Sequence, residues 1–190
     1  MLKIIPILEL PLLIIMVMIR SMMLRRHGIN AIVFGVTDKS DYIIIPIILF
    51  FFYGLLAAVI NLPFPAILIR SFWEIRILHV LSIIICSISL IWFGFTLKIF
   101  GKSFRVGIDE KTQDKLITNG TFAISRNPIY AGFIAFFTGI FIAYSNILIF
   151  AFLVLLIITI HRQILREEMF LKNHYGEEYE EYCSTVRRYF

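Results

Sequence analysis

The amino-acid sequence predicts an all-α integral membrane protein with five transmembrane helices. Of its 190 residues, 59% are hydrophobic and only 16% are charged, and the mean hydropathy is +0.88. Soluble domains average about 45–50% apolar and about 25% charged residues, so a chain of this composition is expected to bury its apolar surface in lipid. Long apolar runs separated by polar segments, with the basic residues gathered on alternate segments, complete the prediction.

The first half of the chain contains three apolar runs of the length that a membrane-spanning helix requires, about 20 residues. The first covers residues 4–24 and is followed by the Arg25-Arg26 pair. Because a signal peptide has its basic residues before the apolar run, we expect this segment to be retained as a helix. The second run covers residues 42–60 and stops at the Asn-Leu-Pro-Phe-Pro sequence of residues 61–65, and the third covers residues 77–100.

A further apolar stretch, residues 128–160, is too long for one helix and too short for two full spans with a loop between them. Its one break is Ser145-Asn146. We therefore expect a tight helical hairpin of two short spans, residues 129–144 and 147–160. The last helix is expected to continue past the membrane surface.

The positions of the basic residues support this odd number of spans. With the N-terminus outside and the C-terminus in the cytoplasm, all 18 lysines and arginines except Lys3, Arg70 and Arg76 fall on the inner side, as the positive-inside rule expects. The net charge of +5 then reflects topology and attraction to anionic lipids, and we expect no nucleic-acid partner. The chain is predicted to be a single membrane domain, with three N-terminal helices in residues 1–97 and a catalytic half in residues 98–190.

Several common catalytic and binding motifs are absent from the sequence. There is no phosphate-binding GxxxxGKS/T, no dinucleotide-binding GxGxxG after a strand, no zinc-protease HExxH and no nucleophile-elbow GxSxG. The four histidines have no metal-ligand spacing, and Cys86 and Cys183 form neither a CxxC motif nor a disulfide framework. We therefore expect no metal site.

Two cytoplasmic segments, residues 98–127 and 159–190, are the predicted location of the site. Asn127-Pro128 predicts an N-cap residue followed by a proline in the first helical turn. The free N–H groups of such a turn bind anions such as a carboxylate, although an isolated Arg-Asn-Pro more often marks a plain helix start. Glu167-Glu168 is expected either to bind an ammonium group or a ribose diol, or to pair with nearby arginines along the helix.

Five short motifs follow one another in the second half of the chain. They are Gly101 with Arg105 and Gly107, Leu116-Ile-Thr with Gly120 and Phe122, Arg126-Asn-Pro with Tyr130 and Gly132, Glu167-Glu168 with Leu171, and Tyr175-Gly with Tyr179, Tyr182 and Arg187. In this order and spacing, over about half of the chain, they resemble the isoprenylcysteine carboxyl methyltransferase family. The chain looks like a small prokaryotic or archaeal member.

The resemblance implies an integral-membrane methyltransferase whose cofactor, S-adenosylmethionine, binds between the cytoplasmic loop and the C-terminal helix. Carried over position by position, the cofactor contacts fall on Gln113, Asp114, Lys115, Leu116, Ile117, Gly120, Phe122, Asn127, Pro128, Ile129, Tyr130 and Glu168. Where the family usually has a histidine and a tyrosine, this sequence has Asn127 and Phe122. An asparagine still donates a hydrogen bond, but it does not titrate.

The substrate that the resemblance implies is a lipophilic, prenylcysteine-type acid that enters from the bilayer. Its carboxylate is already ionised at neutral pH and needs no general base, so the site has to align the reactants and exclude water. Arg162 or Arg166 is the expected partner of this carboxylate, and Glu167 lies beside the cofactor. These three residues are the predicted catalytic residues.

Three other functions are compatible with the sequence. A phospholipid N-methyltransferase has related motifs, but its amine acceptor must lose a proton, and Arg162 and Arg166 are poor neighbours for such a group. A sterol-reductase-like enzyme shares the C-terminal resemblance and binds a nicotinamide cofactor, whereas a non-catalytic scaffold would use its basic loops to contact anionic lipids. The oligomeric state is open, because small residues such as Gly132 and Gly139 serve either internal packing or dimerisation.

Overall fold

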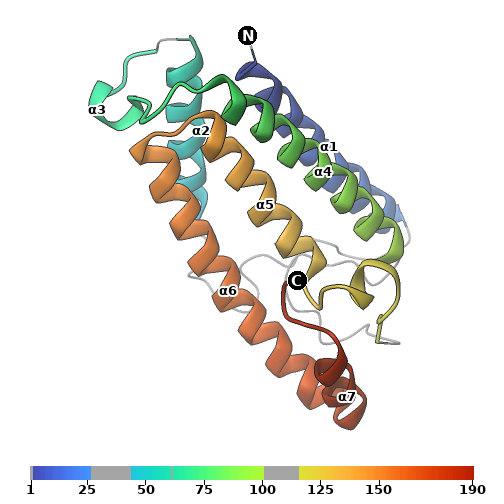
Figure 1. Ribbon diagram of the computed structural model, residues 1–190. Coiled ribbons are helices and arrows are strands. Elements are labelled where there is room, and N and C mark those ends of the chain that lie inside the picture. The colour runs from blue at the N-terminus through green and yellow to red at the C-terminus, as the bar shows by residue number, and fades with distance from the viewer. Residues whose placement is uncertain (1, 27–43, 61, 101–115) are drawn as a thin grey trace.

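A computed structural model describes residues 2–26, 44–60, 62–100 and 116–190, and none of these residues lies in a strand. In chain order the helices are α1 (Ile4–Arg26), α2 (Ile44–Ile60), α3 (Ala66–Ile69), α4 (Arg76–Phe100), the 3₁₀ helix η3 (Gly120–Ala123), α5 (Pro128–Ala143), α6 (Ile147–Tyr175) and α7 (Glu177–Thr185). The five apolar segments all form helices, and α5 with the first part of α6 forms the predicted hairpin (Figure 1).

The ends of α5 and α6 follow from particular residues. Pro128 opens α5, where its fixed φ and its missing N–H are tolerated. Asn146 is the N-cap of α6, and its side-chain oxygen accepts a hydrogen bond of 2.9 Å from Ile149 N. Gly176, with a φ of +55° that glycine readily adopts, separates α6 from α7. Between these points α6 is one continuous helix of 29 residues.

The core forms where α4 and α5 pack along each other, with α1 against α4 and α2 against α6. Gly139 permits the close approach of α4 and α5, because a Cβ atom at this position would lie 2.5 Å from Sγ of Cys86. Phe51 of α2 stacks on Phe152 of α6 with ring centroids 3.7 Å apart. Small residues and aromatic pairs of this kind hold apolar helices together in lipid, where burial from water provides no driving force.

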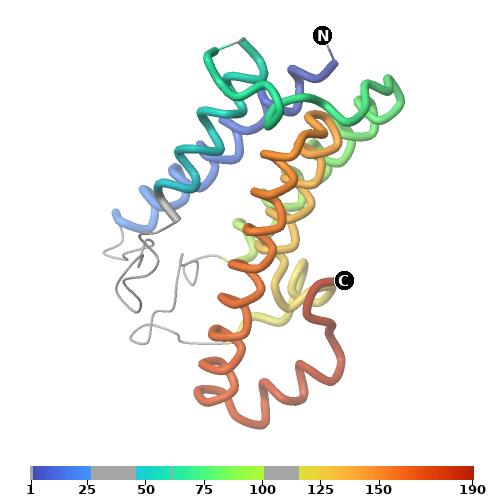
Figure 2. Tube along the Cα trace, turned by 90° about the vertical axis from the view of Figure 1, so that its left-hand side faces the viewer, coloured from blue at the N-terminus to red at the C-terminus, as the bar shows by residue number. Residues whose placement is uncertain are grey.

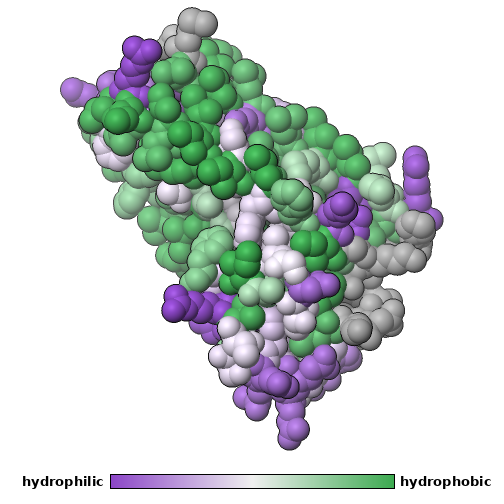
Figure 3. Space-filling model, turned by 45° about the vertical axis from the view of Figure 1, so that its right-hand side comes forward, coloured by the Kyte–Doolittle hydropathy of each residue, from purple (hydrophilic) through white to green (hydrophobic). Residues whose placement is uncertain are grey.

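Three described helices, α1, α4 and α6, are long and apolar enough to cross a membrane. The other two apolar helices, α2 and α5, are shorter. The 16 residues of α5 reach about 24 Å, less than the ~30 Å of a hydrocarbon core. Apolar side chains cover most of the face shown in Figure 3, and hydrophilic ones gather toward the end that carries α7. The protein is therefore an integral membrane protein, while the five crossings and the outward N-terminus stay predictions.

The end of the bundle opposite α7 is fixed by the segment between α3 and α4. Ser145, in the α5–α6 turn, accepts a hydrogen bond of 3.2 Å from Trp73 N and donates one of 3.1 Å to Trp73 O. Trp73 Nε1 also donates to the Ile142 carbonyl at 3.3 Å, and Lys3 pairs with the neighbouring Glu74. With its turn held in this way, the hairpin carries the far end of α6 past the start of α5.

Candidate active site

The last residues of the chain fold back across the polar end of the bundle, beside the segment that precedes α5 (Figure 2). Arg126 N donates a hydrogen bond of 2.9 Å to the Arg187 carbonyl, and Ser125 Oγ donates one of 3.3 Å to the Arg188 carbonyl. We call residues 186–190 the C-terminal strap. Its backbone is thereby tied to the two residues that lead into the first turn of α5.

Two aromatic side chains extend these contacts of the C-terminal strap. Tyr189 Oη and His161 Nδ1 of α6 form a hydrogen bond of 2.8 Å, and the ring of Phe190 meets the indole of Trp92 in α4 edge-on, with centroids 5.7 Å apart. The strap thus contacts α4 and α6 as well as the segment that leads into α5.

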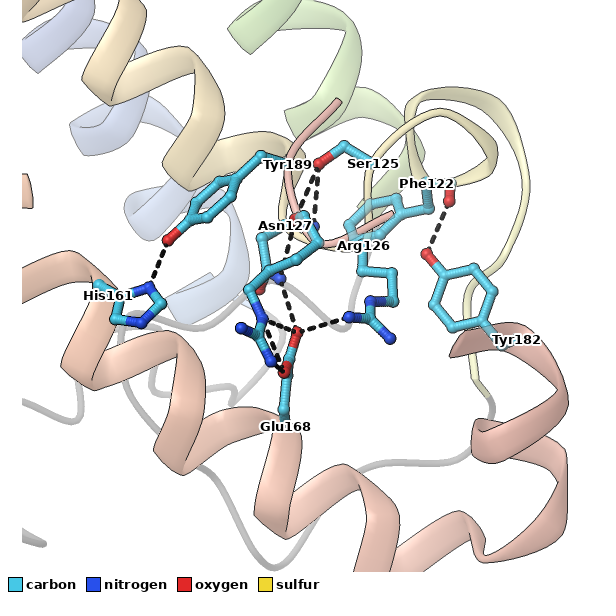
Figure 4. A network of polar contacts seen from close by, with 9 residues as sticks. Phe122, Ser125, Arg126, Asn127, His161, Glu168, Tyr182 and Tyr189 are labelled. Carbon is cyan, nitrogen blue, oxygen red and sulfur yellow. Dashed lines mark hydrogen bonds and ion pairs between the residues drawn. The ribbon is translucent and has the colours of Figure 1, made fainter. Parts of the chain in front are cut away.

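Glu168 of α6 is the centre of these polar residues (Figure 4). Two nitrogen atoms of Arg188 donate hydrogen bonds to it. Nη2 donates to Oε2 at 2.7 Å, and Nε donates to both Oε2 and Oε1, at 3.0 and 3.1 Å. Asn127 Nδ2 donates to Oε1 at 3.3 Å, and Arg126 Nη2 forms an ion pair with Oε1 at 3.4 Å. The Glu168 side chain is 12% exposed, so this carboxylate is largely removed from water and depends on its cationic partners. The hydrogen bond to Glu168 in turn raises the pKa of Arg188.

Asn127 occupies the N-cap position of α5, as predicted, but its side chain makes no hydrogen bond to the first turn of the helix. Its Nδ2 donates to Glu168 and to the Arg188 carbonyl, at 3.3 and 3.2 Å. The backbone N–H of Asn127 is satisfied by Ser125 Oγ at 3.1 Å. A hydrogen bond to a charged acceptor is stronger than one between neutral groups, which accounts for the orientation of the amide toward the carboxylate.

Glu167 belongs to a separate cluster. Adjacent residues of an α-helix project about 100° apart, and Glu167 accordingly faces α5 while Glu168 faces the strap. Tyr130 Oη donates to Glu167 Oε1 at 2.6 Å, and Gln163 Nε2 donates to the same oxygen at 2.8 Å. Arg166 lies close enough to interact electrostatically with this carboxylate. Two neighbouring carboxylates therefore have different partners and are suited to different tasks.

The segment before α5 turns at Gly120, whose φ is +60°. A side chain at this position would collide with Ile99 of α4. The 3₁₀ helix that begins there buries Phe122, and the Phe122 carbonyl accepts a hydrogen bond of 2.6 Å from Tyr182 Oη of α7. Burial raises the pKa of Tyr182, so its hydroxyl stays protonated and remains a donor. Thr121 Oγ1 is buried and has no hydrogen-bond partner among the described residues.

A pocket of about 470 Å³ lies between α6 and α7, beside Glu168. It is lined by Arg126, Leu165, Glu168, Met169, Lys172, Tyr179, Glu180, Cys183 and Arg188. Its volume is in the range of small-molecule sites, about 300–1,000 Å³. Within the parts of the chain that the structure describes, no group of His, Cys, Asp or Glu side chains is arranged to hold a metal ion.

The structure brings together some of the predicted site residues and separates others. Asn127 and Glu168 meet directly, and Tyr130 meets Glu167 in the neighbouring cluster. Among the remaining predicted residues, Pro128 and Ile129 form the first turn of α5, and Gly120 and Phe122 lie in the 3₁₀ helix. Leu116 and Ile117 come just before this 3₁₀ helix. The other three, Gln113, Asp114 and Lys115, lie outside the described residues. Arg162 is exposed on α6 and Arg166 is half-buried, and neither lines the pocket.

Two arginines of the site have no assigned role in the sequence-based prediction. Arg126 stands in a recognised motif, but the motif alone does not show that its side chain turns toward α6. Arg188 is the second residue of a basic pair, and nothing in its spacing indicates contact with Glu168. That contact depends on the reversal of the chain between α6 and α7, which the structure shows (Figure 1).

The fold and the site together define a class of membrane-embedded helical proteins with a polar site at one end, and comparison with known proteins identifies the family. A family model described as "Phospholipid methyltransferase" matches residues 75–178, more than half of the chain. The chain belongs to this family. No solved structure gives a significant match.

The relatives found among curated proteins carry a more specific name. The chain is similar to a "Probable protein-S-isoprenylcysteine O-methyltransferase" of Oryza sativa subsp. indica, with 37% identity over 89 residues, which are 45% of this chain and 47% of the relative. It is also similar to "Protein-S-isoprenylcysteine O-methyltransferase B" of Arabidopsis thaliana, with 34% identity over 89 residues, 45% of each chain. The chain thus spans about half the length of the curated relatives it matches. The predicted resemblance to isoprenylcysteine carboxyl methyltransferases is confirmed.

Proposed function

We propose that the protein is a methyltransferase that transfers a methyl group from S-adenosylmethionine to the carboxylate of a lipid-linked isoprenylcysteine or a similar lipophilic acid. The observation that supports this most directly is the position of Glu168. It is a largely buried carboxylate at the polar end of an apolar helix, in contact with Asn127, in a chain of a methyltransferase family. The site would lie at the cytoplasmic surface, with the N-terminus outside and five membrane crossings.

The residues around Glu168 fit a cationic nucleoside that carries an amino-acid group. The carboxylate suits an ammonium group or a ribose diol. A ligand ammonium would join the donors at Oε1 by replacing the longer contacts of Asn127 and Arg126, at 3.3 and 3.4 Å, while Arg188 keeps its shorter bonds. The buried Thr121 hydroxyl, which lacks a partner among the described residues, offers a further polar contact at the Gly120 turn. We propose that the other predicted cofactor residues, from Gln113 to Tyr130, also contact the cofactor.

The proposed reaction requires little acid–base catalysis by the protein. S-adenosylmethionine supplies an electrophilic methyl group on a sulfonium centre when bound. A carboxylate oxygen of the acceptor forms the new O–C bond as the C–S bond breaks, the electron pair stays on sulfur, and no proton moves. The protein has to hold both reactants in line and keep water away, which contributes several kcal/mol through orientation. Glu167, which accepts hydrogen bonds from Tyr130 and Gln163, would serve such positioning.

The acceptor carboxylate requires a cationic partner, and a guanidinium group provides the best matched one. Arg162 and Arg166 are the candidates that the sequence suggests. The lipid chain of the acceptor would remain in the bilayer, so that the polar cofactor arrives from the cytoplasm and the apolar substrate arrives from the membrane.

A second candidate function, methylation of a phospholipid amine, is favoured by the description of the matching family model. An amine acceptor must lose a proton before it attacks a methyl group, and it gains nothing from neighbouring guanidinium groups. The arginines at the site, Arg126 and Arg188, therefore suit an acid better than an amine.

Calorimetric binding of S-adenosylhomocysteine to the detergent-purified protein tests the proposal, with NADPH as the control ligand. We expect micromolar binding of the nucleoside alone. Transfer of a labelled methyl group to N-acetyl-S-farnesylcysteine, compared with transfer to phosphatidylethanolamine, then separates the two methyltransferase functions. Absence of S-adenosylhomocysteine binding, or binding of NADPH instead, would contradict both.

A further inference from the structure

We propose that residues 62–76 bind anionic phospholipid in the membrane leaflet at the end of the bundle opposite α7, with the lipid phosphate bound by Arg70 and Arg76. We call these residues the α3 segment, because they run from just after α2 to the first residue of α4 and contain α3 (Figure 1). The surface is separate from the candidate active site, and the inference does not depend on the proposed methyl transfer.

The α3 segment is fixed to the helices around it. Trp73 exchanges two hydrogen bonds with Ser145, in the α5–α6 turn, and its indole donates a third to the Ile142 carbonyl. Near the other end of the segment, Tyr53 Oη of α2 donates a hydrogen bond of 2.9 Å to the Pro63 carbonyl. The segment is therefore a preformed surface, which loses little conformational freedom when it binds a partner.

The length of α5 places this surface near the headgroups of the membrane. A helix of 16 residues that starts at one surface of the ~30 Å hydrocarbon core ends about 6 Å below the other. The turn that follows α5 is buried, and the Ser145 hydroxyl and the Asn146 side-chain oxygen are hydrogen-bonded within the protein, as polar groups at this depth require. Since the α3 segment is bonded to this turn, it occupies the remaining depth, at the level of the headgroups.

Large apolar side chains project from the α3 segment. Ile67, Phe72 and Ile75 are 80%, 57% and 50% exposed. Figure 3 shows hydrophobic side chains over this end of the molecule, with hydrophilic ones among them. Exposed apolar side chains on a segment at headgroup level are suited to the acyl chains directly beneath.

Two guanidinium groups of the same segment lack an anionic partner. Arg70 and Arg76 are exposed, and neither forms an ion pair or a side-chain hydrogen bond with another residue that the structure describes. Glu74 is the one acidic residue of the segment, and it pairs with Lys3. The two arginines therefore carry the excess positive charge of this surface.

The charges and the apolar side chains together identify the partner. A soluble anion would make no use of Ile67 and Phe72, and a neutral apolar partner would leave both arginines unpaired. A phospholipid offers acyl chains beside a phosphate, which accepts parallel hydrogen bonds from a guanidinium group. An anionic headgroup also offsets the excess positive charge, which a zwitterionic one does not. Because Trp73 is bonded to the α5–α6 turn, lipid bound here would set the depth of the hairpin in the membrane.

The test uses Trp73 as a fluorescent reporter of the lipid beside it. The chain has two tryptophans, so Trp92→Phe leaves Trp73 alone. The full chain is reconstituted in phosphatidylcholine vesicles to which brominated phosphatidylcholine or brominated phosphatidylglycerol is added, because bromine quenches indole fluorescence on contact. We expect brominated phosphatidylglycerol to quench Trp73 with at least about threefold higher apparent affinity, as the attraction of two arginines to an anionic headgroup at physiological salt predicts.

Two matched variants in the same background assign the preference to one end of the molecule. Arg70→Gln combined with Arg76→Gln should make the two brominated lipids quench Trp73 equally. Arg25→Gln combined with Arg26→Gln removes an exposed pair of arginines at the far end of α1, and this control should keep the preference.

A second measurement keeps the test decisive if Trp92→Phe does not fold. In nanodiscs, replacement of about one third of the phosphatidylcholine by phosphatidylglycerol should raise the Tm of the wild type by at least about 2 °C more than that of the Arg70→Gln, Arg76→Gln variant, since a bound ligand stabilises the folded state. All other basic residues are the same in the two proteins, so the difference reports on the α3 segment alone.

Several outcomes would overturn the proposal. Equal quenching of Trp73 by the two lipids before any arginine is replaced would exclude an anionic preference, and a preference that survives the loss of Arg70 and Arg76 would assign it elsewhere. Quenching by neither lipid would show that the surface lies outside the bilayer or against a second copy of the chain. Equal Tm increases would contradict the proposal as well. None of these measurements uses S-adenosylmethionine or a methyl acceptor, so their failure is distinct from failure of the proposed function.

Discussion

Arg188 and Glu168 form a two-point ion pair in which Arg188 Nη2 lies 2.7 Å from Glu168 Oε2 and Nε lies 3.0 Å from the same oxygen. The pair joins the C-terminal strap to α6, and through Asn127 it also reaches the start of α5. One carboxylate thus connects three segments that are distant in the sequence. The strap is thus held by this carboxylate as well as by its own aromatic contacts.

The first prediction concerns the stability that this pair provides. Arg188→Gln should lower the free energy of unfolding by about 1–2 kcal/mol, a value reduced for the partial exposure of the Arg188 side chain. Thermal unfolding in detergent measures the effect. Arg187→Gln is the matched control, because the contact of Arg187 with Arg126 uses its backbone carbonyl. Equal melting temperatures for the two variants would show that the pair does not hold the strap.

The second prediction concerns the cofactor. Glu168→Gln keeps the size of the side chain and removes its charge, so we expect S-adenosylhomocysteine binding to weaken by at least about a hundredfold, as for a charged contact in a site with little water. Calorimetry measures the affinity, and a melting curve recorded on the same sample reports whether the variant is folded. Glu181→Gln, an exposed carboxylate of α7, should bind as the wild type does. Retained affinity in the folded Glu168 variant would remove this residue from the cofactor site.

The helices were predictable from the sequence because lipid imposes a simple pattern on it. Apolar runs and their breaks gave the order of the five apolar helices, and Ser145-Asn146 marked the hairpin turn where Asn146 caps α6. Hydropathy could not give the full length of α6. The residues after position 160 are more polar than those before it, and they continue the helix as far as Tyr175, where Gly176 ends it.

The sequence predicted the part of the site in which residues of the recognised motifs contact each other in the structure. Asn127 and Glu168 were expected at one site, and they are in direct contact. The contact of Arg188 was not predictable, because it depends on the direction in which the chain turns at Gly176. A glycine with a φ of +55° permits the reversal without indicating which residues it brings together.

The third prediction concerns the separation of the two carboxylates. Tyr130→Phe removes the 2.6 Å hydrogen bond to Glu167, and the loss of a bond to a charged acceptor should lower the free energy of unfolding by about 1.5–3 kcal/mol. Because Glu168 has other partners, the affinity of Tyr130→Phe for S-adenosylhomocysteine should fall much less than that of Glu168→Gln. The rate of methyl transfer should also fall, because Glu167 is proposed to position the reactants. Unfolding curves, calorimetry and turnover measure the three quantities. A loss of affinity as large as that of Glu168→Gln would show that the two clusters act as one.

The last prediction concerns the turn at Gly120, which carries the predicted cofactor residues Gly120 and Phe122. Gly120→Ala places a Cβ atom on a residue with a φ of +60°, which alone costs about 1–2 kcal/mol. It also forces that atom against Cδ1 of Ile99, so the total loss of stability should exceed the backbone contribution.

A double-mutant cycle with Ile99→Val separates these two contributions, because valine lacks the Cδ1 atom that the new side chain would meet. Ile99→Val alone should cost about 0.5–1.5 kcal/mol. If the collision is real, the double variant is more stable than the sum of the single effects predicts, since part of the Gly120→Ala loss is relieved. Chemical unfolding of the four proteins gives the coupling energy. Strict additivity would mean that α4 moves aside without loss, and that Gly120 is required for its backbone conformation alone.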